Sequence, residues 1–278
     1  MTQTGVIMKI LIDGDILAYV CSSAVQKDID WGDGLWTCHA YLDDAVVYFH
    51  QLLGSIKDAL GVNQFYQVNW DECDVIFCFS DAVNFRKTLN PNYKAQRVSH
   101  RKPTCYKGLV DYIHDNYKCA SYPTLEGDDV ISILATCKKG DSIIISGDKD
   151  FKTVPETFFF NFMKNTFVYY HAEEAYRNLM KQVLMGDTAD NYKGCPSVGA
   201  KTAEKIISEE INTKYLWDVV VETYKKKGST EEEAILNFNM AYLLHAVDDK
   251  THKELPATSF EYFTEISHTD SGITFNHT

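Results

Sequence analysis

Residues 8–15 read MKILIDGD, a short apolar run that ends in two aspartates. Two further segments repeat this arrangement, DVIFCFSD at 74–81 and SIIISGDKD at 142–150. Short apolar runs rich in β-branched residues predict strands buried on both faces, as in a parallel sheet covered by helices. Because open α/β sheets place their sites at the carboxyl ends of their strands, the aspartates that follow these runs are candidate site residues.

Apolar residues recur at helical spacing between the predicted strands. This periodicity predicts helices at 41–60 and 129–137, and TFFFNF at 157–162 predicts a fourth strand. After about residue 171 strand patterns nearly stop, and the remaining predicted helices cover 171–186, 200–210, 214–226 and 230–247. The alternation of strands and helices predicts an α/β fold with a mostly parallel central sheet flanked by helices.

Length and composition place the chain among soluble proteins with a large core, since 45% of its 278 residues are hydrophobic. No stretch approaches the ~18 to 20 uninterrupted apolar residues that a membrane helix needs, and the polar start MTQTG lacks a secretory signal pattern. We therefore expect a cytoplasmic protein with no membrane partner. The eight cysteines form no CxxC pair, which favours reduced thiols over a zinc site or a disulfide framework.

The net charge of −12 argues against a polyanionic substrate, because such partners usually need a basic surface. The distribution of charge argues the other way. Residues 86–107, the basic stripe, contain no Asp or Glu and seven cationic residues: Arg86, Lys87, Lys94, Arg97, Arg101, Lys102 and Lys107. On charge alone, a solvated basic loop and a phosphate-binding segment are equal alternatives.

Four acidic residues directly follow predicted strands: Asp13, Asp81, Asp148 and Asp150. An aspartate after a strand is also ordinary in a turn or at a helix N-cap, so each one alone is weak evidence. Four such aspartates at three strand ends in one chain instead indicate a shared site at one edge of the sheet.

Five more carboxylates lie in two short motifs. LEGDDV at 125–130 crowds Glu126, Asp128 and Asp129 into the first turn of a predicted helix, which is more acid than capping uses. GDTADN at 186–191 places Asp187 and Asp190 three residues apart, close enough to share a site if the turn is helical. Mutual repulsion of so many carboxylates is unfavourable unless cations neutralise it.

The nine candidates form a ligand set made only of oxygen: Asp13, Asp81, Glu126, Asp128, Asp129, Asp148, Asp150, Asp187 and Asp190. Such sets favour Mg²⁺ or Mn²⁺ over zinc or copper. Two ions about 4 Å apart can activate an attacking water and stabilise the leaving oxygen of a phosphodiester. The sequence therefore predicts metal-dependent phosphodiester hydrolysis.

Basic and aromatic residues beside this set predict contacts to nucleic acid. Lys94 and Arg97 lie three residues apart and would share a helix face, and Tyr93 offers a ring for base stacking. The candidate DNA-binding residues of the basic stripe are Arg86, Tyr93, Lys94, Arg97, Arg101 and Lys102.

GCPSVGAKT at 194–202 predicts a tight turn that opens a helix, and free backbone N–H groups at such a start bind phosphate. The candidate DNA-binding residues here are Ser197, Gly199, Lys201 and Thr202. A simple helix-turn-helix corner without a ligand is the alternative.

Taken together, these segments resemble the 5′ nuclease superfamily, which includes flap endonucleases and polymerase-associated 5′ nuclease domains. The similarity runs from about Ile7 to Ile207 and rests on a combination of motifs: IDGD, FSDAVNFRK, NPNYKAQR, EGDDV, SGDKDF, GDTADNYKG and GCPSVGAKTA. Several of these motifs look closest to the 5′-to-3′ exonucleases of short-tailed phages, which clear RNA primers and trim DNA ends during replication.

The resemblance implies a PIN-like α/β nuclease core and a helix-two-turn-helix region that grips duplex backbone. We expect the core at residues 1–186, with a basic, arch-like segment at about 83–110. The helical DNA-binding region is expected at 187–250, and a loosely attached tail at 251–278. Whether the basic segment forms an arch through which a 5′ end threads stays open.

The resemblance also implies residue roles. A first divalent ion would be held by Asp13, Asp81, Glu126, Asp128 and Asp129, and a second by Asp148, Asp150, Asp187 and Asp190. Lys94 and Arg97 would contact the scissile phosphate, which gives an implied catalytic set of Lys94, Arg97, Asp13, Asp81, Asp128 and Asp148. Asp15 is expected to support the site or to cap a helix. A potassium ion at the helix-two-turn-helix is a further implied cofactor, although Ser197, Val198 and Gly199 replace the superfamily's Gly-x-Gly turn.

The expected function is divalent-metal-dependent 5′-to-3′ exonuclease activity on DNA and RNA primer ends in phage DNA replication, with or without flap endonuclease activity. Expected partners are double-stranded or branched DNA, RNA/DNA hybrids with 5′ ends, and replication proteins in the host cytoplasm. Two alternatives are a binding module for branched DNA that no longer cuts, and a PIN-type RNA nuclease. The complete acidic set argues against the first, and the helices after Asp187 argue against the second.

Overall fold

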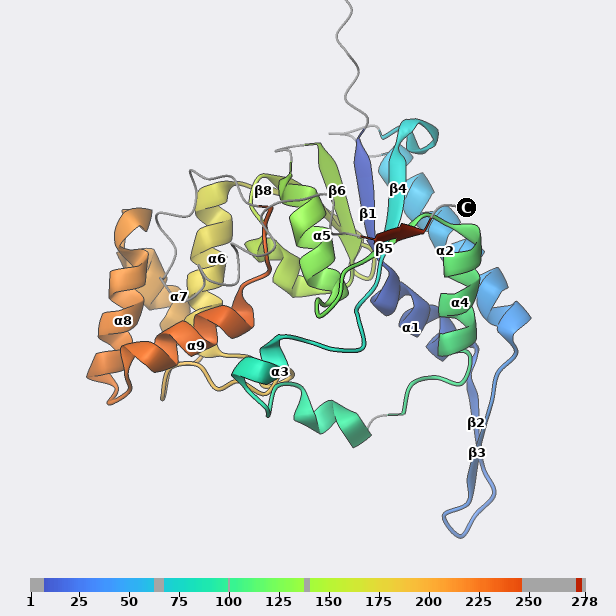
Figure 1. Cartoon of the computed structure of the whole chain (residues 1–278), viewed down its shortest axis with the longest axis horizontal. Coiled ribbons are helices and arrows are strands. Elements are labelled where there is room, and N and C mark those ends of the chain that lie inside the picture. The colour runs from blue at the N-terminus through green and yellow to red at the C-terminus, as the bar shows by residue number, and fades with distance from the viewer. Residues whose placement is uncertain (1–7, 63–67, 100, 138–140, 247–273, 277–278) are drawn as a thin grey trace, which may run out of the picture.

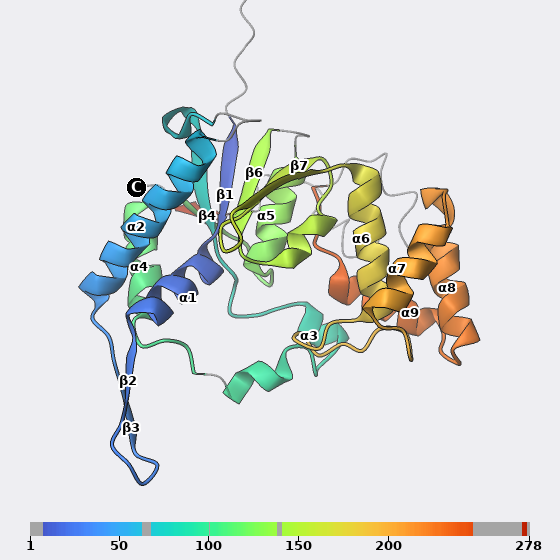
Figure 2. The same cartoon turned by 180° about the vertical axis from the view of Figure 1, so that it is seen from behind.

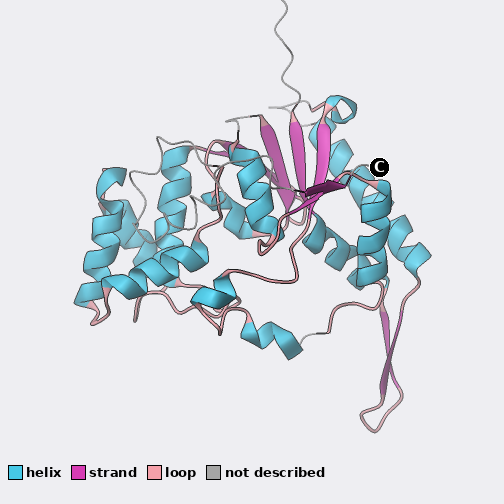
Figure 3. Ribbon diagram, viewed as in Figure 1, coloured by secondary structure: helices cyan, strands magenta, loops and turns pink. Residues whose placement is uncertain are grey.

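The computed structural model describes residues 8–62, 68–99, 101–137, 141–246 and 274–276 (Figure 1). Strands and helices alternate up to Tyr170, and helices dominate after it (Figure 3). The strands are β1 (Lys9–Asp13), β2 (Lys27–Asp30), β3 (Trp36–His39), β4 (Asp74–Cys78), β5 (Cys119–Ser121), β6 (Ser142–Ser146), β7 (Thr157–Asn161), β8 (Thr166–Tyr170) and β9 (Thr274–Asn276).

The α-helices are α1 (Gly14–Val25), α2 (Leu42–Gly61), α3 (Arg86–Leu89), α4 (Tyr106–Asn116), α5 (Gly127–Thr136), α6 (Ala172–Met185), α7 (Ala200–Glu209), α8 (Leu216–Lys226) and α9 (Glu231–Ala241). Short 3₁₀ turns complete the chain: η1 (Trp70–Glu72), η2 (Ala95–Ser99), η3 (Lys149–Thr153) and η4 (Thr213–Tyr215).

The central sheet has the strand order β8-β7-β6-β1-β4-β5-β9 within the described residues. Strands β7, β6, β1, β4 and β5 run parallel, and the edge strands β8 and β9 are antiparallel. β1 lies between β6 and β4, with Ile12 opposite both Ile145 and Phe77. The carboxyl ends of these three strands therefore meet at one edge, and the mostly parallel sheet predicted from the sequence is confirmed.

Helices cover both faces of this sheet. Strand side chains alternate between faces, so Leu11 and Ile144 join the hydrophobic cluster that includes residues of α5 and α6. Ile10, Ile12 and Ile145 join a second cluster with α1, α2 and α4 on the opposite face. Figures 1 and 2 show these layers from opposite sides. This double burial explains why the central strands are continuous apolar runs rather than alternating ones.

Most of the predicted helices are present at the expected places, but the one predicted at 230–247 is too long. Helix α9 ends at Ala241, and residues 242–246 are not helical. In this stretch Leu244 N donates to Asp129 Oδ1 (3.1 Å) and Ala246 N donates to Thr136 Oγ1 (2.8 Å). These bonds to α5 replace the backbone bonds that a longer helix would need. Residue 247 lies outside the described residues.

Several elements were not predicted from the sequence, namely α1, α4, β5, β8 and the β2–β3 hairpin. Helix α1 follows the first strand without a loop, because Asp13 both ends β1 and caps the helix. The hairpin projects from the body of the molecule (Figure 1) and exposes Trp31, Leu35 and Trp36.

The end of the chain departs in part from the expected loose tail. Thr274–Asn276 form β9, which pairs with β5 at the sheet edge. The remainder of the expected tail, 251–273 and 277–278, lies outside the described residues. The boundary between residues 186 and 187 stays a prediction, and one hydrophobic cluster contains residues from both sides of it, such as Leu184 and Val220.

The cysteines and the hydropathy of the helices complete the description of the fold. All eight cysteines are free thiols, five of them buried. Among the described helices, none combines the length and the apolar character that a bilayer crossing requires.

Candidate active site

Asp13 joins β1, α1 and β6 at the carboxyl edge of the sheet. Its Oδ1 accepts a hydrogen bond from Ile16 N (3.0 Å), and its Oδ2 accepts one from Ser146 Oγ (2.7 Å). Only 4% of the residue is exposed. Burial, together with the charges of Asp15 and Asp148, raises the pKa of Asp13 to about 7 despite these bonds. Its ionised form therefore needs a nearby cation.

Asp148 and Asp150 lie in the turn that follows β6. Asp148 N donates to Ser146 Oγ (3.0 Å), and Asp148 Oδ1 accepts from Asp150 N (2.9 Å). Asp150 Oδ1 is buried and has no hydrogen-bond partner among the described residues. Burial and the charge of Asp148 raise the pKa of Asp150 to about 6. A buried acceptor without a partner is unfavourable, and it is suited to bind a hard cation.

Glu126 lies just before α5 and is surrounded by cations. Its Oε1 forms an ion pair with Lys94 Nζ, and its Oε2 accepts from Tyr93 OH (2.9 Å) and Arg86 NH1 (3.2 Å). Burial alone would raise the pKa of Glu126, but Lys94 and Arg86 outweigh it and lower the pKa to about 2. Glu126 is therefore ionised without any added metal.

Asp128 approaches the same region from the first turn of α5. Burial raises its pKa well above the usual range, and the charges of Asp13 and Asp148 add to this effect. Three carboxylates from β1, α5 and the turn after β6 therefore converge and repel one another. Asp81 does not take part in this cluster, so a site shared by all the strand-end aspartates stays a prediction.

Asp129 occupies the same helix start but pairs with the core. Its two oxygens bind the Arg86 guanidinium, Oδ2 to NH1 at 2.6 Å and Oδ1 to NH2 at 2.8 Å. Asp129 is 0% exposed and Arg86 1%. The expectations that Asp129 binds a metal and that Arg86 contacts DNA are therefore corrected, because each side chain neutralises the other away from solvent.

Tyr93 is also too deeply placed for its expected role. Only 3% of it is exposed, which leaves too little of the ring to stack on a base. Its hydroxyl donates to Glu126 Oε2 (2.9 Å) and lies 3.1 Å from Asp190 Oδ2. The stacking expectation is corrected, since Tyr93 instead orients two carboxylates.

A tight loop from Gly186 to Gly194 carries Asp187 and Asp190. Asp187 and Tyr192 pair across it, with backbone N···O distances of 2.9 and 3.1 Å, so the turn is not helical. Both glycines have positive φ, +68° and +66°. A Cβ on Gly186 would lie 2.4 Å from Gly194 N. The loop therefore requires glycine at both ends, which fixes where the two aspartates emerge.

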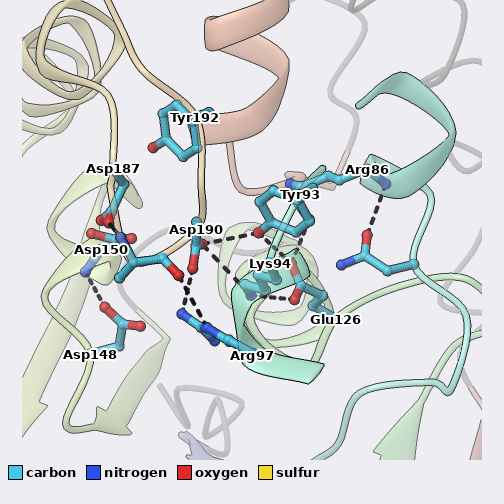
Figure 4. Close-up of polar contacts among 12 residues, drawn as sticks. Arg86, Tyr93, Lys94, Arg97, Glu126, Asp148, Asp150, Asp187, Asp190 and Tyr192 are labelled. Carbon is cyan, nitrogen blue, oxygen red and sulfur yellow. Dashed lines mark hydrogen bonds and ion pairs between the residues drawn. The ribbon is translucent and has the colours of Figure 1, made fainter. Parts of the chain in front are cut away.

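The basic segment 90–97 is bound to this loop through the backbone. Lys94 N donates to Asp190 O (3.0 Å), and Gln96 Nε2 donates to Ala189 O (2.8 Å). Lys94 has φ +53°, and Arg97 follows in a 3₁₀ turn rather than on a shared α-helix face. The loop and the basic segment therefore form one unit, in which Lys94 and Arg97 face the acidic residues (Figure 4).

Three cationic side chains form ion pairs with Glu126, Asp187 and Asp190. Lys94 Nζ binds Glu126 and lies 3.7 Å from Asp190 Oδ2, and Arg97 NH2 binds Asp190 Oδ1. Lys149 Nζ lies 3.3 Å from Asp187 Oδ2. In the part of the chain that the structure describes, no three His, Cys, Asp or Glu side chains are arranged to hold a metal ion as they stand.

The donor set nevertheless fits a hard divalent ion. Oxygen atoms line this part of the site, and the buried Asp150 Oδ1 has no hydrogen-bond partner among the described residues. Burial and neighbouring carboxylates raise the pKa values of Asp13 and Asp128, and a divalent ion would offset this effect. The remaining carboxylates, Glu126, Asp187 and Asp190, are balanced by flexible Lys and Arg side chains.

Asp81 and Asp15 accept hydrogen bonds from residues next to the acidic cluster. Asp81 is exposed, and its oxygens accept backbone bonds from Ala82 N (2.8 Å) and Thr124 N (2.7 Å), which lower its pKa. Asp15 Oδ2 accepts from Ser80 N (2.8 Å) and its Oδ1 from Tyr106 OH (2.7 Å). Asp13, not Asp15, is the cap of α1, and support of the site by Asp15 stays a prediction.

Sequence reasoning missed Ser146, Lys149 and Gln96. Ser146 binds both Asp13 and Asp148 N, and its position at the end of a strand, two residues before Asp148, was a usable signal. Lys149 stands between Asp148 and Asp150, so its pairing with Asp187 was not predictable without the fold. Gln96 reaches a backbone far away in sequence, and no local pattern signals such a bond.

The turn before α7 borders an open cavity of about 720 Å³. Ser197 and Gly199 line one side of it, and Asn90, Asn92 and Asn237 are also among its lining residues. Lys201 and Thr202 lie exposed in the first turn of α7, next to Gly199, which caps that helix. The backbone N–H groups of this helix start are therefore reachable from solvent, as the phosphate-binding prediction requires.

Known proteins are similar to this chain in sequence and in fold. A model of the family described as 5′-3′ exonuclease, N-terminal resolvase-like domain, matches residues 9–180. An exodeoxyribonuclease of Enterobacteria phage T3 and an exonuclease of Escherichia phage T7 are each 29% identical, over 84% of this chain and 87% of the relative. The zinc-bound T5 5′-exonuclease has the same fold, with a TM-score of 0.56 and 16% identity over 84% of this chain and 88% of that one.

Proposed function

Because the chain belongs to the 5′-3′ exonuclease family, we propose that its acidic site and basic segment act together to hydrolyse phosphodiester bonds from the 5′ ends of DNA. The protein is a hydrolase of the 5′-3′ exonuclease and flap endonuclease type. The observation that carries the residue assignment is the bridge by Ser146 Oγ between Asp13 Oδ2 (2.7 Å) and Asp148 N (3.0 Å), beside the buried Asp150 Oδ1 that has no hydrogen-bond partner among the described residues.

We assign the divalent-ion ligands to eight of the nine predicted carboxylates: Asp13, Asp81, Glu126, Asp128, Asp148, Asp150, Asp187 and Asp190. Asp129 is left out because Arg86 already neutralises it. Bound Mg²⁺ or Mn²⁺ would supply positive charge that favours ionisation of the attacking water and stabilises the leaving oxygen. A pair of such ions matches the number of carboxylates, and a potassium ion near Ser197 stays a prediction.

Lys94 and Arg97 are assigned to the scissile phosphate. Both lie on the unit that faces the acidic site, and both can donate charge-assisted hydrogen bonds to phosphate oxygens. In that position they stabilise the negative charge that develops as the bond breaks. The remaining proposed DNA contacts are Arg101, Lys102, Ser197, Gly199, Lys201 and Thr202.

The proposed substrates are duplex or branched DNA and RNA/DNA hybrids with 5′ ends, in the replication of phage DNA with its replication proteins. A module that binds without cutting is disfavoured, because all eight assigned carboxylates are present. A PIN-type RNA nuclease is disfavoured by the helical region after Asp187, which packs into the same core as the sheet.

The assignment is tested with Asp148→Asn and Asp150→Asn on a 5′-labelled duplex with Mg²⁺. Each variant is expected to lose most of its cleavage, because each removes a negative charge from the converging set. Asp111→Asn is the matched control, since Asp111 is exposed and forms an ion pair with Lys107 on α4. Full cleavage by the pure Asp148 and Asp150 variants would remove the assignment. Metal-independent binding without product would support the binding module.

A panel of equal-length DNA, RNA and hybrid duplexes, with and without a 5′ flap, tests the substrate class. Release of labelled mononucleotides or short oligonucleotides from DNA and hybrid ends is the expected result. Cleavage of RNA alone would favour the PIN-type alternative.

A further inference from the structure

Cations of the chain occupy carboxylates that the proposed function assigns to metal ions. Lys94 pairs with Glu126 and approaches Asp190, and Arg97 pairs with Asp190 (Figure 4). In the part of the chain that the structure describes, the acidic residues are not arranged as a ready ion site. The chain's own ammonium and guanidinium groups balance charges that a divalent ion would otherwise balance.

The ion pairs of Lys94 and Arg97 are more exposed to solvent than the ion pair between Arg86 and Asp129. Arg86 and Asp129 are 1% and 0% exposed, and the arginine also binds Tyr242 O (2.7 Å). The side chain of Lys94 is 17% exposed and that of Arg97 52%, and both are long enough to turn toward solvent. Lys94 and Arg97 can therefore leave their carboxylates without unpacking the core, whereas Arg86 cannot.

We propose that Lys94 and Arg97 are exchangeable counter-ions. In the metal-free enzyme they occupy Glu126 and Asp190, and they move to the phosphates of the substrate when divalent ions take over those carboxylates. The exchange forms and breaks only ion pairs, and Glu126 and Asp190 have a cationic partner both before and after it. This inference rests on the proposed function and describes how the same site is regulated.

Two consequences follow from such an exchange. Before DNA binds, Lys94 and Arg97 compete with metal, so the free enzyme binds metal more weakly than its carboxylates alone would. A bound phosphate attracts the two cations and removes this competition. Because coupling between two ligands is reciprocal, phosphate strengthens metal binding and metal strengthens phosphate binding by the same factor.

The test measures Mn²⁺ binding by calorimetry on the full chain without nucleic acid, at constant pH. Lys94→Met and Arg97→Gln are expected to bind Mn²⁺ about tenfold more tightly than the unmodified chain, within the usual range of coupling between sites. Lys94→Arg keeps the charge and is expected to restore weak binding. Lys107→Met is the matched control, because Lys107 belongs to the basic stripe but pairs with Asp111 on α4.

A second titration adds deoxyadenosine 5′-monophosphate, which has a phosphate but no diester bond to cut. It is expected to tighten Mn²⁺ binding by the unmodified chain and not by the Lys94→Met, Arg97→Gln double variant. Circular dichroism checks folding, and the exposed Arg97 allows the test even if the Lys94 variant does not fold.

The outcomes separate the two proposals. Unchanged or weaker Mn²⁺ binding by the folded variants would overturn the exchange while leaving metal-dependent cleavage intact. Absence of any Mn²⁺ binding by the unmodified chain would overturn both the exchange and the proposed metal site.

Discussion

Arg86 and Asp129 form a bidentate ion pair beneath the acidic site, with N···O distances of 2.6 and 2.8 Å. The pair joins α3 to α5, and backbone groups of the segment after α9 bind both partners: Tyr242 O accepts from Arg86, and Leu244 N donates to Asp129. Burial opposes the charge of Arg86, but Asp129 outweighs it and raises the arginine pKa well above its usual range. The start of the basic stripe is therefore part of the core.

Arg86→Met is expected to lower the free energy of unfolding by about 3 to 5 kcal/mol, because it leaves Asp129 buried without its partner. Urea denaturation followed by circular dichroism measures this change. Lys107→Met, at an exposed ion pair, should change it by less than about 1 kcal/mol. A loss as small as that of the control would mean that the buried pair does not stabilise the fold.

The stability of the metal-free chain is expected to fall as the pH rises from about 4 to 7. Asp13 and Asp150 have pKa values raised to about 7 and about 6, so the folded state binds more protons than the unfolded state in this window. Their contribution is complete below pH 4 and is lost as pH rises through the folded values. Glu126 acts oppositely, but its pKa is lowered to about 2, so its contribution changes only below about pH 4.5.

Thermal melts in EDTA between pH 4 and 7 measure this dependence. Asp111→Asn is the control, because it removes an exposed carboxylate outside the site. Asp13→Asn should flatten the profile, since Asn does not ionise. Added Mg²⁺ should raise the melting temperature most at pH 7, where its ligands are deprotonated. An identical slope for Asp13→Asn and the unmodified chain would contradict the assignment of this effect.

The sheet was predictable because its strands are buried on both faces, so their sequences are continuous apolar runs. Ile143 and Ile144 face opposite layers, and both are fully buried. Helix α1 was missed because Asp13 leaves no loop between strand and helix, and a loop is the usual boundary signal. The hairpin strands read KDID and WTCH, with no regular alternation of apolar and polar residues that would predict a strand.

The candidate site was predictable as a set of acidic residues at strand ends, but their individual partners were not. Asp129 and Asp128 are neighbours with the same local sequence signals, yet only Asp129 meets a buried arginine. Tyr93 and Arg86 looked exposed because the segment around them is polar. Both side chains are buried by contacts with Glu126, which is 33 or more positions away along the chain. The local sequence pattern does not predict such distant contacts.

Gly186→Ala is expected to destabilise the chain by about 3 kcal/mol and to abolish most cleavage. The new Cβ would meet the backbone of Gly194 at a residue with φ +68°, so the loop must open and shift Asp187 and Asp190. Gly199→Ala is the matched control for stability, because its Cβ would meet nothing within 4 Å and its φ is −97°. Equal denaturation midpoints for the two variants would show that the loop adapts.

Lys94→Met is expected to slow the reaction although it tightens metal binding. Loss of a charge that stabilises the breaking phosphodiester typically lowers kcat by about 10² to 10³, and saturating metal cannot restore it. Single-turnover cleavage of a 5′-labelled duplex over a range of Mn²⁺ concentrations separates the two effects. The maximal rate should fall while the Mn²⁺ concentration at half-maximal rate decreases. A lower maximal rate with an increased metal requirement would instead place Lys94 as a support for the acidic ligands, and a rate equal to that of Lys107→Met would remove it from the catalytic machinery.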